Sequence, residues 1–332
     1  MPQKGRNFKL PRRKFLHLAA AATALPAASR IARAQSYPTR PVHIIVGFPA
    51  GSTGDTVTRL LGQRLSERLG QPFVIENRPG AGSNIAAEAV VRARPDGHTL
   101  LCVTTANEIG VTLYKNLNFN FIRDIAPVAG FVQLPLVMEV NPSVPAKTVL
   151  ELIAYSKANP GKINMASAGN GTIHHVAGEL FNMMAGINML HVPFRGSPPA
   201  LTDLMGGQVQ LMFDLTISSI EYIRAGKLRG LAVTSATSSQ ALPDIPTVGE
   251  FVPGYEASAW NGVGAPKDTP PEIVDKLNRE INACLTDPKI KEWLANIGAV
   301  PMPMTPAEFG KLISDETDKW GKVVTFAGIR AD

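Results

Sequence analysis

The sequence contains only two cysteines in 332 residues, and no segment after the N-terminal region is apolar for long enough to cross a membrane. Cys102 lies in the apolar run Leu100–Val103, and Cys284 lies in a segment with helical periodicity. Neither has a histidine beside it, so nothing supports a thiol nucleophile. We expect two buried free thiols, with a disulfide as the alternative in an exported protein.

The N-terminus has the features of an export signal. Six basic residues lie between Lys4 and Lys14, the apolar run Phe15–Ala28 follows, and Ala32-Arg33-Ala34 forms a cleavage site. No cysteine follows that site, which argues against a lipoprotein. The run Arg12–Leu16 resembles a twin-arginine signal, with the general secretory route as the alternative. We therefore predict a signal peptide over residues 1–34, cleavage near Ala34 and a periplasmic protein.

A basic surplus is absent from the rest of the chain. Residues 1–34 hold eight of the 33 Lys and Arg residues and no Asp or Glu, which leaves 25 basic and 27 acidic residues. The formal charge of +6 thus becomes −2 after cleavage. Nucleic acid would require a basic surface, so we expect no nucleic-acid partner.

The mature chain is too long for one typical core, and it alternates β-rich runs with amphipathic helices. This pattern predicts an α/β protein of two lobes, one from residues 35–138 plus 259–332 and one from residues 139–258. The expected strands are 42–46, 73–76, 99–104, 137–140, 163–166, 189–192, 209–213, 228–234 and 260–265. The expected helices are 56–69, 85–93, 146–158, 173–185, 198–205, 271–285, 288–296 and 306–326.

Two segments, 44–55 and 163–172, each read as a strand that runs into a Gly/Ser/Thr-rich turn and then a helix. Small residues allow a sharp turn and close approach of a ligand. The free N–H groups at a helix start favour a negative charge. In the first segment we expect Asp55 to be the N-cap residue. The pair of turns predicts a ligand held at both ends.

Several catalytic motifs are incomplete. Gly80-Ala81-Gly82 lacks the third glycine of a dinucleotide fingerprint, and Gly47–Gly54 lacks the Lys-Ser/Thr pair of a P-loop. Met165–Gly169 resembles a nucleophile elbow, but Met165 replaces its first glycine. An exported hydrolase that uses Ser167 with a histidine therefore remains an alternative function.

His174 and His175 invite a metal interpretation, but adjacent residues point to different faces of a helix and no His-Glu-x-x-His pattern occurs. We expect no metal and no cofactor. We expect His174 and His175 to be histidines at the start of a helix near the ligand, or surface residues.

From Tyr37 to Ile329 the chain resembles the periplasmic substrate-binding proteins of tripartite tricarboxylate transporters, the Bug-type receptors. The blocks that carry the resemblance are Pro41–Gly51, Glu76–Gly82, Pro95–Leu100, Asn141–Pro145, Ala166–Thr172, Ala177–Phe181, His191–Gly196, Gly207–Asp214, Leu231–Thr234 and Leu242–Thr247.

The resemblance implies a type II periplasmic-binding-protein fold, with two α/β lobes joined by a two-strand hinge and a small carboxylate in the cleft between them. In one lobe it implicates the Phe-Pro-Ala-Gly loop and its neighbours, and in the other the second turn and two nearby positions. The implied ligand-binding residues are Phe48, Ala50, Gly51, Ser52, Thr53, Asp55, Thr105, Asn107, Ser167, Gly169, Asn170, Thr172, Arg195 and Asp214.

These features together predict a monomeric, non-enzymatic receptor that delivers a carboxylate to the permease subunits of a membrane transporter. A ligand sensor for a membrane kinase is a further alternative with the same fold. Di- and tricarboxylates, acidic amino acids and aromatic acids all fit such a site.

Overall fold

The structure is a computed structural model that describes residues 37–331. The predicted signal peptide and its cleavage site lie outside the described residues. Residues Arg40–Asp332 form one unit, and the fold described below is that of this unit. Among residues 37–331, no helix is long and apolar enough to cross a membrane.

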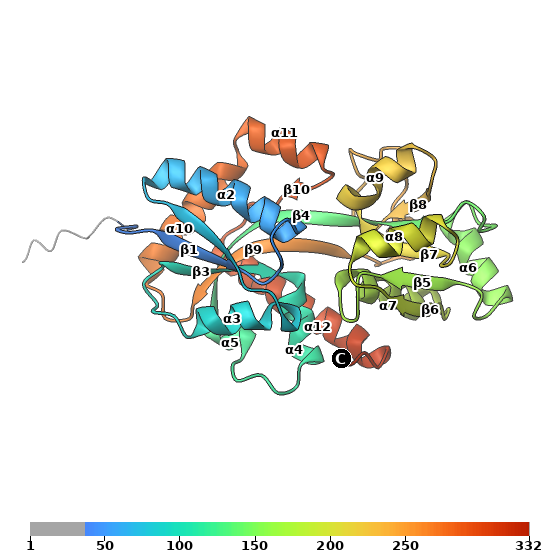
Figure 1. The fold of residues 1–332 in the computed structure, drawn as a ribbon, viewed down its shortest axis with the longest axis horizontal. Helices are drawn as coiled ribbons and strands as arrows, with labels where there is room; N and C mark the ends of the chain where they lie inside the picture. Colours follow the sequence, from blue (N-terminus) through green and yellow to red (C-terminus); the bar gives the residue numbers. More distant parts are fainter. Residues whose placement is uncertain (1–36, 332) are drawn as a thin grey trace, which may run out of the picture. The chain divides into compact units, whose positions relative to one another are not determined.

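The elements follow the expected alternation of strands and helices (Figure 1). The strands are β1 (Val42–Val46), β2 (Phe73–Asn77), β3 (Thr99–Thr104), β4 (Ile125–Val140), β5 (Asn164–Ser167), β6 (Leu190–Pro193), β7 (Leu211–Leu215), β8 (Arg229–Val233), β9 (Ser258–Pro266) and β10 (Val300–Pro301). The helices are α2 (Thr53–Leu69), α3 (Asn84–Val91), α4 (Thr105–Leu113), α5 (Phe121–Asp124), α6 (Val149–Ala158), α7 (Ile173–Ala185), α8 (Ser197–Met205), α9 (Thr216–Arg224), α10 (Pro271–Leu285), α11 (Pro288–Asn296) and α12 (Pro306–Phe326), with short 3-10 turns at Ala81–Ser83 and Val248–Glu250.

One long strand, β4, links two sheets. Its first part, Ile125–Pro135, pairs antiparallel with β9, and its last part, Leu136–Val140, pairs antiparallel with β7. The strand order is β2-β1-β3-β9-β4-β7-β5-β6, with β10 and β8 also paired to β4. The fold is therefore two-lobed, and the chain passes from one lobe to the other inside a single strand (Figure 1).

The two lobes repeat the same local topology. In the first, β1 lies between β2 and β3, and all three are parallel. In the second, β5 lies between β6 and β7, again all parallel. After the central strand, the next strand of the chain lies on one side of it and the strand after that lies on the opposite side. Such a reversal leaves a crevice at the carboxyl ends of the strands, which is where open α/β sheets bind ligands.

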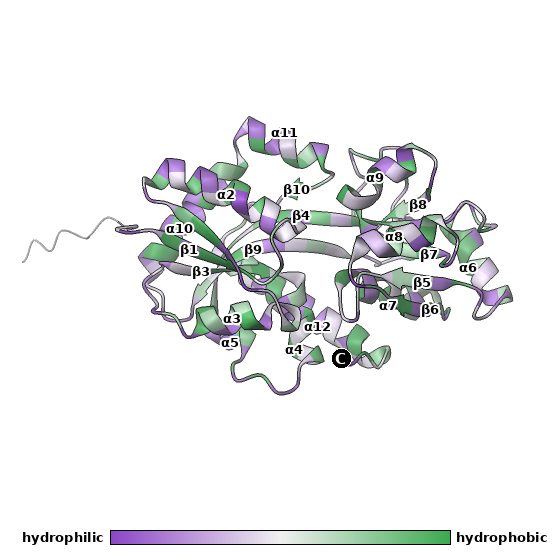
Figure 2. Ribbon diagram, viewed as in Figure 1, coloured by the Kyte–Doolittle hydropathy of each residue, from purple (hydrophilic) through white to green (hydrophobic). Residues whose placement is uncertain are grey.

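Each lobe has its own buried core, and α12 contributes to both. Phe309 and Ile313, near the start of α12, pack in the core of the first lobe with Trp260. Trp320 and Val323, further along, pack in the core that contains β5, β7 and α7. Figure 2 shows apolar residues along strands such as β1 and mixed faces on outer helices such as α11. Helix α12 thus tethers the second lobe in addition to β4.

Two expectations about elements are wrong, and several elements are absent from the expected set. Strand β4 has 16 residues, not only 137–140, and its register shifts between Pro127 and Ala129 and between Gly130 and Val132. Helices α4, α5 and α9 and strand β10 are not among the expected elements. The N-cap of α2 is Ser52, whose hydroxyl accepts from the Asp55 N–H; Asp55 already lies inside the helix. Cys102 and Cys284 are buried free thiols, as expected.

Candidate functional site

The fourteen predicted ligand residues lie at or just beyond the carboxyl ends of five strands. Eight of them follow β1 and β3 in the first lobe, and six are at the ends of β5, β6 and β7 in the second. These are the ends that flank the two crevices described above. The structure therefore groups the predicted residues into two clusters, one in each lobe.

The first cluster is organised by the buried side chain of Asp55. Its carboxylate accepts from the Gly51 N–H at 2.9 Å, from Asn77 Nδ2 at 2.8 Å and from Arg59 Nε at 2.9 Å. These hydrogen bonds and the Arg59 charge outweigh the opposing effect of burial, which is the largest single influence, and lower the pKa of Asp55. Because all of these partners are internal, Asp55 shapes the loop and does not present a free carboxylate to a ligand.

Sequence reasoning overlooked Asn77 and Ser83 as supports of this loop. Asn77 Nδ2 also donates to the Phe48 carbonyl at 3.0 Å. Ser83 is fully buried and has a φ of 74°, and a Cβ atom on Gly47 would lie 2.0 Å from its hydroxyl oxygen. Gly47 is therefore required for contact between the two loops. Asn77 lies in the family block Glu76–Gly82 and Ser83 directly follows it, but no spacing in the sequence pairs either residue with the loop of Gly47.

Thr105 and Asn107 serve the start of α4. The Thr105 hydroxyl accepts from the Trp260 N–H at 3.1 Å, and Asn107 Oδ1 accepts from the Thr104 N–H at 2.9 Å. Both residues are buried. Their described hydrogen bonds join α4 to β3 and β9, which is a structural role.

The second cluster begins with the turn after β5. Ser167 is fully buried, and its hydroxyl oxygen lies 2.6 Å from His191 Nε2 and 3.1 Å from the Gly169 N–H nitrogen that donates to it. The Thr172 hydroxyl donates to the Gly169 carbonyl at 2.8 Å. The Phe194 N–H donates to the Ser167 carbonyl, which brings the exposed Arg195 beside this turn. The hydroxyls of this turn thus mainly hold its own backbone.

Two histidines stack behind this turn. The rings of His175 and His191 are 3.4 Å apart and nearly parallel, and His175 Nδ1 accepts from the Gly171 N–H at 3.2 Å. Burial lowers the pKa of His175 to about 3, with the nearby His191 as a second cause, and burial lowers the pKa of His191 to about 4. Both rings are therefore neutral near pH 7.

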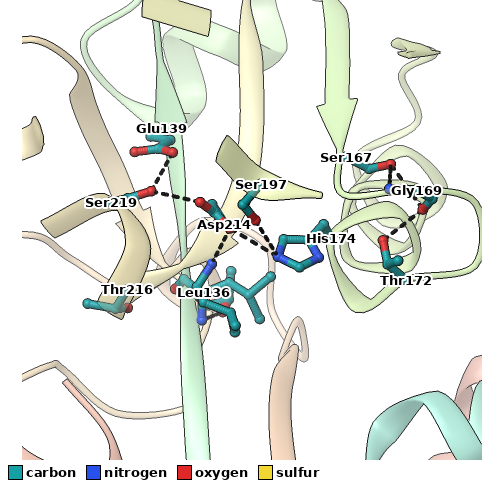
Figure 3. Close-up of polar contacts among 12 residues, drawn as sticks. Leu136, Glu139, Ser167, Gly169, Thr172, His174, Ser197, Asp214, Thr216 and Ser219 are labelled. Atoms are coloured by element: carbon teal, nitrogen blue, oxygen red, sulfur yellow. Dashed lines mark hydrogen bonds and ion pairs between the residues drawn. The ribbon is translucent and has the colours of Figure 1, made fainter. Parts of the chain in front are cut away.

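Asp214, at the end of β7, is the centre of a buried polar network (Figure 3). Its Oδ1 accepts from Ser197 Oγ and from the Leu215 N–H, each at 2.8 Å, and lies 3.0 Å from His174 Nε2. Ser219 Oγ lies 3.2 Å from Asp214 Oδ2 and 2.7 Å from Glu139 Oε1. Burial and the negative charge of Asp214 raise the pKa of Glu139 well above its ordinary value. The network joins β4, β7, α7, α8 and α9.

A cavity lies elsewhere in the described part of the chain. It has a volume of about 700 Å³ and is lined by loop 235–241, helix α11 and the segment Gly298–Pro301, together with Gln133, Pro135 and Glu256. None of the fourteen predicted residues lines it. Among residues 37–331, no group of three or more His, Cys, Asp or Glu side chains is placed to hold a metal ion.

Comparison with known proteins establishes the family. The profile described as "Tripartite tricarboxylate transporter family receptor" matches residues 57–329. The chain belongs to this receptor family. Protein BugT of Bordetella pertussis is 37% identical over 300 residues, which cover 90% of this chain and 92% of BugT.

Solved structures of similar receptors share the fold. Rpa4515 of R. palustris, solved with adipate, has a TM-score of 0.79 and 37% identity, and covers 89% of this chain and 99% of its own. MatC of Rhodopseudomonas palustris, solved with malate, has a TM-score of 0.74 and 33% identity, and covers 87% and 100%. The periplasmic binding protein BugD has a TM-score of 0.75 and 35% identity, and covers 89% and 100%. The family and the type II fold inferred from the sequence are confirmed.

The stacked histidines predict a loss of stability in acid. Their pKa values in the folded protein lie below the ordinary 6.5, so the unfolded chain takes up protons first as the pH falls. The contribution of these neutral rings to the free energy of unfolding is complete above about pH 6.5 and is lost as the pH falls from 6.5 to about 3. Denaturant unfolding at pH 7 and 4.5 measures it. Between pH 7 and 4.5 the free energy of unfolding of His175→Gln should fall by about 2 kcal/mol less than that of the native receptor.

The variant His43→Gln is the control, because it removes a partly exposed histidine from β1 in the other lobe. It should keep most of the native loss of stability between pH 7 and 4.5, because its own contact, with Glu76, is partly exposed and contributes little. Parallel stability profiles for native protein and His175→Gln would contradict the assignment.

Proposed function

We propose that the protein captures a small carboxylate between the first and the second cluster and delivers it to the permease of a tripartite transporter. The observation that carries this proposal is the repeated topology. In each lobe the central parallel strand ends in a Gly/Ser/Thr turn at the start of a helix. Membership of the receptor family supports the same role.

The internal hydrogen bonds sharpen the set of proposed contacts. The Gly51 and Ser52 N–H groups donate to Asp55 and to the Pro49 carbonyl, so the start of α2 offers the N–H groups of Thr53 and Gly54. We propose that Phe48, Ala50, Gly51, Ser52 and Thr53 surround one carboxylate. Asp55 would then position the backbone of this loop, and Thr105 and Asn107 would position the backbone around the start of α4, without contacting the ligand.

In the second lobe we propose contacts from Gly169, Asn170, Thr172 and Arg195, with Ser167 and Asp214 as supports. Arg195 is exposed, and no ion-pair partner for it occurs among the described residues. A ligand with negative charge at both ends would meet a helix N-terminus in each lobe and this guanidinium in the second. This favours dicarboxylates, the class to which the adipate of Rpa4515 and the malate of MatC belong.

The lobe boundaries also remain a proposal. We propose residues 35–138 plus 259–332 as one lobe and residues 139–258 as the other. The change of partner along β4 between Pro135 and Leu136 and the start of β9 at Ser258 support these limits to within a few residues. A monomer that closes about these crossings would exclude water and strengthen the contacts of both helix termini.

The contact between Ser167 and His191 specifically favours the rival hydrolase function. Two observations argue against a hydrolase. Ser167 is fully buried. The Gly169 N–H, which a hydrolase would need to stabilise an oxyanion, donates instead to the Ser167 hydroxyl. We infer that the contact supports the turn. Turnover of small esters that disappears in Ser167→Ala would contradict the receptor proposal.

A thermal-shift screen tests capture directly. The panel is succinate, malate, adipate, citrate, aspartate, glutamate and benzoate. An acid present at 100 times its dissociation constant should add about 2.7 kcal/mol to the free energy of unfolding and raise the melting temperature by several degrees. No shift with any member would contradict the proposal. Co-purification with permease subunits, as opposed to a membrane kinase, separates transport from sensing.

Glycines at the two ends of α2 provide a matched test of the first cluster. Gly51 has a φ of 82° and Gly70 a φ of 71°, and a Cβ at either would meet nothing within 4 Å. Leucine should therefore cost a similar 1–2 kcal/mol of backbone strain at both positions. We expect Gly51→Leu to abolish the thermal shift and Gly70→Leu to retain it. Equal shifts in the two variants would remove the Gly51 loop from the site.

A further inference from the structure

His174 occupies an unusual position in the first turn of α7. Its side chain is only 9% exposed, and its Nε2 atom lies 3.0 Å from Asp214 Oδ1 and 3.4 Å from Ser197 Oγ. Its other ring nitrogen, Nδ1, is buried and has no hydrogen-bond partner. In Figure 3 this nitrogen is on the side of the ring that faces the turn of Gly169 and Thr172.

The contacts of Asp214 determine which nitrogen carries a proton. Its Oδ1 accepts from Ser197 Oγ and from the Leu215 N–H, a group that can only donate. The oxygen that faces His174 is therefore an acceptor. Nε2 of His174 must then be the donor. Nδ1 accepts when the ring is neutral and donates when the ring is charged.

The N-terminus of α7 beside this ring is uncapped. Thr172 is the N-cap residue, but its hydroxyl donates to the Gly169 carbonyl and makes no capping bond. No hydrogen bond is described for the N–H groups of Ile173, His174 and His175, whereas the Val176 N–H donates to Thr172. A buried, unpaired ring nitrogen thus belongs to the first turn of a helix whose free N–H groups favour a negative charge.

We propose that His174 contacts the second carboxylate of the ligand directly, as an imidazolium that donates from Nδ1 while Asp214 holds Nε2, and that the receptor takes up a proton when it binds. The proposal rests on the function proposed above. An anion at Nδ1 and the Asp214 carboxylate at Nε2 both favour the charged ring. A monocarboxylate, which would occupy only the first cluster, would lack this contact.

Other titratable groups surround this ring. They are Asp214 on β7, Glu139 on β4, His175 and Glu179 on α7, His191 on β6 and Arg195 in the loop before α8. The low pKa values of His175 and His191 keep these rings neutral above pH 6. The measurement is therefore made between pH 6 and 8.5, where these two rings do not exchange protons.

Isothermal titration calorimetry in buffers of different ionisation enthalpy measures the proton uptake. The probe is adipate or malate, whichever gives the larger thermal shift. For the native receptor we expect an uptake that approaches one proton in the upper part of this pH range, and an affinity that falls by up to about tenfold per pH unit there.

Two substitutions separate the ring nitrogens. Glutamine places its amide near Nε2 and asparagine places its amide near Nδ1, and neither titrates. We expect His174→Gln to bind about ten- to a hundredfold more weakly at pH 6.5, His174→Asn to recover part of that loss, and both to bind without proton uptake. His43→Gln is the control and should keep the native uptake.

Native binding without proton uptake would overturn the proposal, as would unchanged affinity and uptake in His174→Gln. Both results would leave the carboxylate receptor intact. Absence of binding by the native protein to either acid would instead contradict the proposed function on which this inference rests. Circular dichroism of each variant verifies that a lost signal does not come from unfolding.

Discussion

The structure depends on the hydrogen bonding of one strand to two sheets. Residues Ile125–Pro135 of β4 pair with β9, and Leu136–Val140 pair with β7 and β8. Since the backbone bonds of β4 are shared between the lobes, the lobes cannot separate, but a bend near the change of partners can alter their angle. Helix α12 adds a second tether through Trp320. Connections that hold the lobes together but permit a bend suit the proposed receptor that closes on its ligand.

The repeated strand order determines where the two proposed ligand-binding turns lie. In both lobes the next two strands of the chain lie on opposite sides of a central parallel strand, and the turn after that central strand leads into the N-terminus of a helix. Most hydroxyls and carboxylates of these turns bond to their own backbone: Asp55 to Gly51, Thr172 to Gly169, Ser167 to Gly169. The groups proposed to meet the ligand include helix N–H groups, Arg195 and Nδ1 of His174. The proposed recognition is therefore mainly by preorganised backbone, which would select for charge and length more than for side groups.

Much of this fold could be predicted from the sequence where the signal is local. The run Val42–Val46 and the periodicity of residues 173–185 and 271–285 gave elements with the observed bounds. The length of β4 could not be predicted because Pro127, Gly130 and Pro135 interrupt it, and pairing with β9 is needed to hold it. The family blocks predict which loops form the site, but the roles of residues inside these loops depend on partners far away in the sequence. Asn77 is 22 residues from Asp55, and His191 is 24 residues from Ser167.

The central claim is that one acid bridges the carboxyl ends of the two parallel strand groups. A crystal structure of the receptor with adipate or malate tests it most directly. The account predicts one carboxylate at the N-terminus of α2, beside Gly51–Gly54, and the other at the N-terminus of α7, beside Gly169 and His174. An acid bound in the 700 Å³ cavity between loop 235–241 and α11, with both turns unoccupied, would contradict it.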